Sequence, residues 1–161
     1  MNSKISFLAS VLALSAFSVA CGSTQKTEER SLGGNMIVDA ANGQLAKVPV
    51  IGFPPFGTSM SITQFDQYGE NAATAAKAVI ASMPAGYKLQ ITGHANQHRA
   101  KSAAYTKNLS EQRAKYVYNY FVKKGVDKTK LTYVGVGDSE PDSSLSRDQN
   151  RRVTFRLVET K

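Results

Sequence analysis

The stretch Tyr87-Lys-Leu-Gln-Ile-Thr-Gly93 lies near the middle of this 161-residue chain. Its apolar residues Tyr87, Leu89 and Ile91 alternate with polar ones, which is typical of a strand with one buried face. Gly93 ends the alternation, and a polar loop follows. The stretch predicts a half-buried strand against which the neighbouring parts of the chain pack.

The residues before this strand predict a helix and an earlier strand. Thr63 with Asp66 three residues later resembles a capping box, and Pro84 ends the segment. Val48 begins a short apolar stretch, residues 48–53, in which Pro49 restricts a strand to a sheet edge or a strand start. The helix would bury the apolar residues that recur at helical spacing: Phe65, Tyr68, Ala72, Ala75, Ala76, Val79 and Met83.

The residues after the central strand predict a second helix and two more strands. Asn108 with Glu111 three residues later indicates a helix start, and Gly125 indicates its end. Residues 131–137 and 153–158 have strand patterns. The inward residues of the helix would be Ala114, Val117, Tyr118 and Phe121.

This alternation of elements predicts an α+β fold. Helices between strands act as crossovers that cover one face of a sheet, and the last strand is free to pair antiparallel. The expected architecture is a β-α-β-α-β-β sandwich in which two main helices pack on a mixed sheet.

The N-terminal residues have the pattern of an export signal. Lys4 precedes an apolar run, residues 5–17, and small residues precede Cys21. The sequence Ser18-Val-Ala-Cys21 resembles the lipobox of bacterial lipoproteins, with Ser18 where Leu is common. We predict a signal peptide at residues 1–20 and lipidation of Cys21. The alternative is cleavage by the ordinary signal peptidase, which leaves Cys21 as a free thiol.

The segment between Cys21 and the first strand is polar. It is rich in Ser, Thr, Glu, Lys, Gly and Asn, a composition typical of flexible linkers. We therefore predict a lipidated cysteine with a flexible tether at residues 21–47 and one folded domain at residues 48–161.

The chain is basic, with 20 Lys and Arg against 12 Asp and Glu and a net charge of +8. The bases are spread along the whole sequence, without the basic stripe and interleaved aromatics of nucleic-acid-binding domains, so no nucleic-acid partner is predicted. Most of the excess charge is expected to lie on a solvated surface. An anionic cell-wall polymer is the alternative partner.

Five motifs in order resemble the OmpA-like C-terminal domain over about residues 50–158. Such domains occur in peptidoglycan-associated lipoproteins and in OmpA-like lipoproteins of spirochaetes. The resemblance implies a module that holds peptidoglycan noncovalently through the diaminopimelate of its stem peptide. The motifs are Ile91-Thr-Gly-His94, Leu109-Ser-Glu-Gln-Arg-Ala114, Gly125-Val126, Gly135-Val-Gly137 with Pro141, and Arg147-Asp-Gln-Asn-Arg-Arg-Val153.

The resemblance also implies ligand contacts from an Arg and an Asp. The Arg corresponds to Arg113. The predicted helix start at Asn108 places Arg113 in the first turn, where a positive charge is unfavourable to the helix dipole. An anionic ligand bound at the same helix end would compensate this charge. The family's Gly-His-Thr-Asp is here Gly93-His94-Ala95-Asn96, so Asn96 replaces the Asp and Ala95 precedes it. A neutral hydrogen bond is weaker than a charged one, and weaker binding is expected.

Three further residues are assigned to the binding site by the same resemblance. Thr106 lies near the place of a family Asn, and Thr58 lies where the family often has a polar pair after the first strand. Of the two arginines at the entry to the last strand, Arg152 is assigned to the ligand and the other to a structural role. No metal site and no cofactor are predicted, because neither His94 nor His98 has a metal-type spacing to other ligands.

The expected protein is thus an outer-membrane lipoprotein, anchored through Cys21, whose domain lies in the periplasm and links the envelope to the cell wall. The alternative is an OmpA-like surface or envelope interaction protein with weak or lost peptidoglycan binding that contacts host or anionic envelope components. No enzymatic activity is predicted, because no catalytic constellation is recognisable in the sequence.

Overall fold

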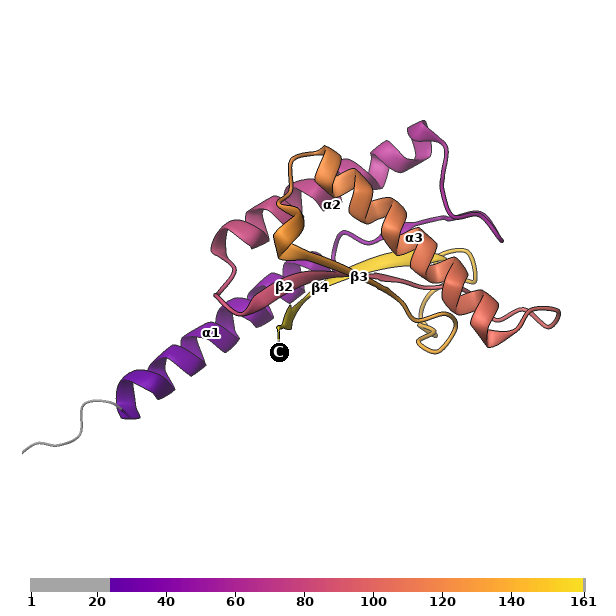
Figure 1. Ribbon diagram of the computed structural model, residues 1–161. Coiled ribbons are helices and arrows are strands. Elements are labelled where there is room, and N and C mark those ends of the chain that lie inside the picture. Colours follow the sequence, from indigo (N-terminus) through magenta and orange to yellow (C-terminus); the bar gives the residue numbers. More distant parts are fainter. Residues whose placement is uncertain (1–23, 161) are drawn as a thin grey trace, which may run out of the picture.

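A four-stranded mixed sheet forms the centre of the domain (Figure 1). The computed structural model describes residues 24–160. The strand order is β1-β4-β2-β3, in which β2 pairs in parallel with β3 and antiparallel with β4, and β1 pairs antiparallel with the start of β4. β1 lies at the sheet edge, as Pro49 predicts. The strands are β1 (Val50–Ile51), β2 (Tyr87–Gly93), β3 (Leu131–Gly135) and β4 (Arg152–Glu159).

Two long helices cover one face of this sheet (Figure 1). α2 (Ile62–Ser82) and α3 (Ala103–Lys123) follow β1 and β2, and the short 3-10 helix η1 (Lys128–Lys130) leads into β3. The α+β class and the two-helix sandwich on a mixed sheet are confirmed. The core between the layers is made of buried residues from both helices and the inner strands, among them Phe65, Ala76, Val79, Leu89, Ile91, Val117, Phe121 and Phe155.

Both long helices begin earlier than the sequence predicts. Ser61 caps α2 and accepts a hydrogen bond from the Gln64 N–H, so the predicted cap at Thr63 is wrong. Ser102 caps α3 and accepts from the Tyr105 N–H, so the start predicted at Asn108 is also wrong. In each case a serine further upstream is the capping residue. The sequence misplaces both starts because the spacing of apolar residues locates the interior of a helix but not its first turn.

The segment predicted to be a flexible tether is a helix up to Leu45. α1 (Thr24–Leu45) ends against the sheet, where Ala41 and Leu45 are buried. The Asn42 Oδ1 atom accepts a hydrogen bond from the Leu157 N–H at 2.7 Å, on the part of β4 that lies beyond its pairing with β1. The tether prediction is wrong for this segment because the docked end of α1 covers an otherwise unpaired strand edge, which composition alone does not reveal.

The folded domain therefore begins before residue 48, within α1. The predicted signal peptide, residues 1–20, and the predicted lipidation site Cys21 lie outside the described residues. None of the helices within residues 24–160 has the length and apolar composition that a membrane span requires.

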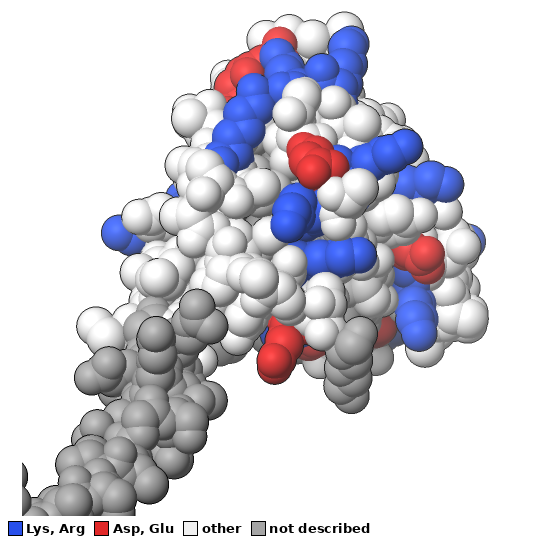
Figure 2. Space-filling model, turned by 60° about the vertical axis from the view of Figure 1, so that its left-hand side comes forward, with Lys and Arg blue, Asp and Glu red and all other residues white. Residues whose placement is uncertain are grey.

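Charged side chains are mixed over the visible surface. Figure 2 shows the side of the domain from which α1 projects, with basic side chains outnumbering acidic ones and uncharged residues between them. Such a distribution fits a solvated basic surface.

Candidate functional site

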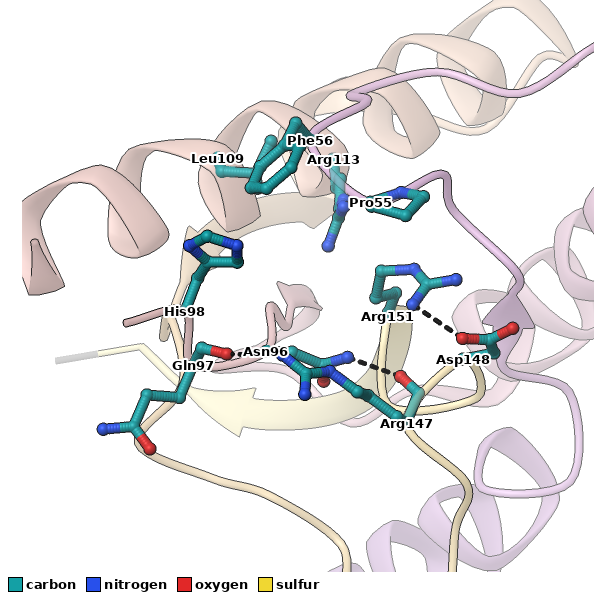
Figure 3. A pocket seen from close by; sticks show the side chains of 10 residues that line it. All are labelled: Pro55, Phe56, Asn96, Gln97, His98, Leu109, Arg113, Arg147, Asp148 and Arg151. Carbon is teal, nitrogen blue, oxygen red and sulfur yellow. Dashed lines mark hydrogen bonds and ion pairs between the residues drawn. The ribbon is translucent and has the colours of Figure 1, made fainter. Parts of the chain in front are cut away.

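A pocket of about 280 Å³ lies at the end of the domain where β2 ends and β4 begins (Figure 3). Its walls come from the loop after β1, the loop after β2, the helix α3 and the loop before β4. The lining residues are Pro55, Phe56, Asn96, Gln97, His98, Leu109, Arg113, Arg147, Asp148 and Arg151.

Arg113 reaches the pocket from the middle of α3 and is only 1% exposed. Its guanidinium donates hydrogen bonds to three backbone carbonyl oxygens: from Nε to Gly57 at 2.9 Å, from Nη1 to His94 at 3.0 Å and from Nη2 to Pro54 at 2.8 Å. A guanidinium has five N–H donors, so these bonds leave donors for a ligand. Arg113 therefore joins the loop after β1 to the end of β2 and faces the pocket.

The close approach of α3 to the sheet brings Arg113 to this position. A Cβ atom on Gly93 would lie 1.9 Å from the Ser110 carbonyl oxygen, and one on Gly135 would lie 2.3 Å from the Glu111 nitrogen. Ser110 is fully buried, and its Oγ atom accepts a hydrogen bond from the Gly137 N–H at 2.8 Å. Only glycine on both strands lets the helix backbone come this near.

Arg113 is a buried cation without a carboxylate partner in the described part of the chain. Among residues 34–160, whose side chains the structure describes, the ion pairs are Lys124 with Glu70 and Arg151 with Asp148. Burial lowers the pKa of Arg113 to about 10, the charge of Arg151 adds to this effect, and Tyr105 opposes it. Arg113 stays charged at neutral pH, and its charge is not neutralised by a neighbouring acid.

The sequence-based reason for choosing Arg113 is wrong, although the residue does line the pocket. Because α3 begins at Ala103, Arg113 lies in mid-helix, where it neither opposes the dipole of a first turn nor has unpaired backbone N–H groups beside it. The positive charge at the pocket comes from the guanidinium itself and not from the end of a helix. Burial among carbonyl oxygens distinguishes this arginine from those on the surface.

Two arginines of the loop before β4 complete the basic lining. Arg151 donates from Nε to the Phe53 carbonyl oxygen at 2.5 Å and from Nη1 to the Asp148 carboxylate at 2.8 Å. Arg147 is exposed and donates from Nη2 to the Gln97 carbonyl oxygen at 2.9 Å. Sequence reasoning did not assign either residue to the site. Both belong to a quoted motif, but the pattern does not tell which of its arginines face the pocket.

Arg152 lies elsewhere than predicted. It is 8% exposed, donates to the Asn150 Oδ1 atom at 2.6 Å and does not line the pocket. The two adjacent arginines thus have roles opposite to those assigned, with Arg151 at the pocket and Arg152 tying loops together. Successive residues at a strand entry point to opposite sides, which reverses the assignment.

Asn96 lines the pocket, whereas its neighbour Ala95 is buried beneath the pocket lining. The Asn96 Nδ2 atom donates to the Arg147 carbonyl oxygen at 2.5 Å and so fixes the loop after β2 to the loop before β4 (Figure 3). Ala95 is buried, and its N–H donates to the Gly137 carbonyl oxygen at 2.8 Å. Asn96 therefore has a structural bond that an aspartate at this position cannot make.

Thr106 and Thr58 do not line the pocket. Thr106 is buried, and its hydroxyl bonds to the Ala103 carbonyl oxygen and to the Asp138 carboxylate, both at 3.0 Å. Thr58 is exposed on the loop after β1. Thr106 stabilises the start of α3, and the geometry gives Thr58 no contact with the site.

An aromatic group forms one wall of the pocket. The Phe56 ring meets the His98 ring edge to face, with centroids 5.0 Å apart. The His98 Nδ1 atom accepts a hydrogen bond from the Ala100 N–H at 3.2 Å, which places the proton of a neutral ring on Nε2. This wall adds an apolar surface and a donor to a site whose other polar groups are mainly arginines.

The fold and the site define the class as a small α+β domain with a loop-lined pocket that is bordered by a buried arginine. A family model described as the OmpA family matches residues 60–154, which is more than half of the chain. The chain belongs to the OmpA family.

Several solved structures have a similar fold. The peptidoglycan-associated lipoprotein from Burkholderia pseudomallei is similar with a TM-score of 0.54 and 22% identity, over 76% of this chain and 99% of that one. The OmpA-like domain of FopA1 from Francisella tularensis gives 0.52 and 22%, over 69% and 73%. The periplasmic domain of Helicobacter pylori MotB gives 0.52 and 19%, over 70% and 72%. At these identities the likeness shows the fold alone.

One curated protein shares sequence with part of the chain. The photosystem I P700 chlorophyll a apoprotein A2 of Gloeobacter violaceus is 35% identical over 82 residues. The match covers 45% of this chain and 9% of that protein, so the chain spans about a tenth of the length of this relative.

Proposed function

We propose that this protein is an outer-membrane lipoprotein that binds the diaminopimelate of peptidoglycan stem peptides noncovalently and links the envelope to the cell wall. Cys21 carries the lipid anchor, the domain faces the periplasm, and no bond is made or broken in the ligand. The proposal combines membership of the OmpA family with a pocket that suits a carboxylate.

The buried guanidinium of Arg113 carries the proposal. A cation that is 1% exposed and has no acidic partner among residues 34–160 is costly to bury unless it acquires an anion. Its three carbonyl bonds fix the plane of the guanidinium, and a fixed planar fork suits the two oxygens of a carboxylate. The side-chain carboxylate of diaminopimelate supplies that group.

The membrane part of the proposal rests on the N-terminal sequence. Ser18-Val-Ala-Cys21 resembles a lipobox, and two or three acyl chains at about 0.8 kcal/mol per buried CH₂ give stable attachment. The similar Burkholderia protein is named a peptidoglycan-associated lipoprotein, which agrees with the proposed lipid anchor and with the proposed peptidoglycan binding. Detergent partition and the N-terminal mass of the expressed protein test the anchor, and a Cys21→Ala variant that stays in the detergent phase argues against it.

Co-sedimentation with diaminopimelate-type peptidoglycan tests the binding function. The wild type should sediment with this polymer and remain in solution with lysine-type peptidoglycan, which lacks the side-chain carboxylate. Arg113→Lys keeps the positive charge but loses the planar fork, and retention should fall at least about ten-fold. Arg156→Gln removes one arginine from the exposed side of β4 and is the matched control, with retention unchanged.

Failure of the folded wild type to sediment would favour the alternative function. Asn96 stands where the family has an aspartate, and this replacement is the observation behind an interaction protein without peptidoglycan binding. Equal retention on both polymers would mean that the diaminopimelate carboxylate is not the group recognised.

A further inference from the structure

A second hollow of about 570 Å³ adjoins the pocket on the side of Arg147. It is lined by Gln97, His98, Arg99 and Arg147, and all of these except Arg99 also line the pocket. The two spaces therefore share a wall, and one extended ligand can occupy both. The second hollow adds Arg99 to the basic groups of the first.

The cations around this double site outnumber the acids available to them. Asp148 is the one acidic residue that lines either space, and its carboxylate is bound to Arg151. Among the side chains of residues 34–160, neither Arg99 nor Arg147 has an ion-pair partner. Both are exposed, and Arg147 uses a single N–H for its bond to the Gln97 carbonyl oxygen. Donors for a further anion remain at the mouth of the pocket.

The one carboxylate among the described residues that line the site, that of Asp148, already compensates the charge of Arg151. The amide of Asn96 donates to the Arg147 carbonyl oxygen, and the Asp148 carboxylate is paired. A carboxylate that is already paired with a cation attracts a ligand ammonium group less strongly, so the exposed arginines offer the larger electrostatic contribution. A second carboxylate of the ligand, next to the first, is the group that the remaining donors suit.

We infer that the site binds two carboxylates of one stem peptide, one at Arg113 and the other at Arg147 and Arg99. This inference rests on the proposed function. A stem peptide offers the side-chain carboxylate of diaminopimelate and, on the residue before it, the α-carboxylate of a γ-linked glutamate. The domain accordingly selects peptidoglycan in which this glutamate carboxyl is free and discriminates against the amidated form.

Titration calorimetry of the mature full chain with two synthetic tripeptides tests the inference. Both have the sequence alanine, γ-linked D-glutamate and diaminopimelate, and they differ in whether the glutamate α-carboxyl is free or amidated. Amidation should weaken binding to the wild type about five- to ten-fold, because a hydrogen bond to a charged group becomes a neutral one. Arg147→Gln should bind both peptides with the affinity that the wild type has for the amidated one.

Two further variants test whether the effect of Arg147→Gln comes from the lost charge or from a disturbed loop, since Arg147 also bonds to the Gln97 carbonyl oxygen. Arg99→Gln removes a cation whose side chain makes no hydrogen bond to residues 34–160, and it should reduce the effect of amidation. Arg156→Gln should leave that effect unchanged. Equal affinity of the wild type for both peptides, or an equal amidation effect in Arg147→Gln, overturns the second carboxylate site and leaves the proposed function intact. A folded wild type that binds neither peptide overturns both.

Discussion

Arg113 serves the fold and the proposed site through the same guanidinium. Its bonds to the carbonyl oxygens of Pro54, Gly57 and His94 connect two loops that are distant in sequence. An apolar residue would leave three acceptors without this donor, and a buried unsatisfied polar group costs about 1–3 kcal/mol. The binding test therefore uses Arg113→Lys, which keeps a donor at this position.

His94 makes the stability of the domain depend on pH. The side chain is 4% exposed, and burial, followed by the charge of Arg152, lowers the pKa of His94 from 6.5 to about 4. Between these values the unfolded chain binds a proton that the folded domain does not, so the free energy of unfolding falls as pH decreases from 6.5 to 4. We expect this residue to account for a loss of up to about 3 kcal/mol.

Urea denaturation at pH 7, 5.5 and 4 measures this contribution. His94→Gln keeps a polar group near the Thr154 hydroxyl, which lies 2.9 Å from the His94 Nε2 atom, but does not titrate. The variant should lose less stability across the window than the wild type. If the free energy of unfolding falls equally with pH in both proteins, the pH dependence belongs to another group.

Asn96→Asp should destabilise the domain even though it restores the residue that the family has. The Asn96 Nδ2 atom donates to the Arg147 carbonyl oxygen, and an ionised carboxylate places an acceptor against that oxygen. We expect a loss of about 1–3 kcal/mol in the free energy of unfolding at pH 7, measured by denaturant titration. Asn96→Ala removes the donor without adding an acceptor and should cost less. Equal losses would show that repulsion between the two oxygens has no part.

The contact between α3 and the sheet depends on glycine in two strands. Gly93→Ala would place a Cβ atom 1.9 Å from the Ser110 carbonyl oxygen, which is backbone and cannot turn aside. We expect α3 to be displaced and the free energy of unfolding to fall by more than about 3 kcal/mol. Gly43→Ala is the control: Gly43 is exposed in α1 with nothing within 4 Å of the new atom, and this change should stabilise by up to about 1 kcal/mol. A tolerated Gly93→Ala would contradict the close approach.

The docked end of α1 should contribute to the stability of the domain. Leu45 is 1% exposed, and Leu45→Ala should cost about 2–4 kcal/mol through lost burial and a cavity. Met36 lies on the same helix and is 69% exposed, so Met36→Ala should change stability by less than about 0.5 kcal/mol. Thermal unfolding of the two variants measures the difference. A flexible tether would give no difference between them.

At the level of elements, the sequence predicts what depends on local pattern. The alternation in β2 and the helical spacing in α2 and α3 locate those elements, because each buries one face against the sheet. The helix starts were misplaced because several hydroxyl residues near each start are competent caps. α1 was missed because its docking depends on a strand edge more than a hundred residues away, the edge at Leu157 that Asn42 covers.

For the whole molecule, the site was predicted only in part. The residue pattern identifies Arg113 and Asn96, which line the pocket, but not Arg147 or Arg151, whose directions depend on the path of the loop before β4. Arg152, Thr106 and Thr58 were assigned to the site from the family pattern, and the structure places none of them in the pocket lining. Which side of a loop a side chain occupies is decided by the tertiary structure.

The position of α1 has a mechanical consequence. The helix has 22 residues, about 33 Å in length, and its N-terminal part projects from the domain at the end opposite to the loops that form the pocket (Figure 1). With the membrane at one end and the wall at the other, as proposed, tension on the protein runs along the strands of the sheet. The chain passes from α1 into β1, which pairs antiparallel with the start of β4 beside the pocket, so the hydrogen bonds between β1 and β4 are loaded together in shear instead of opening one after another.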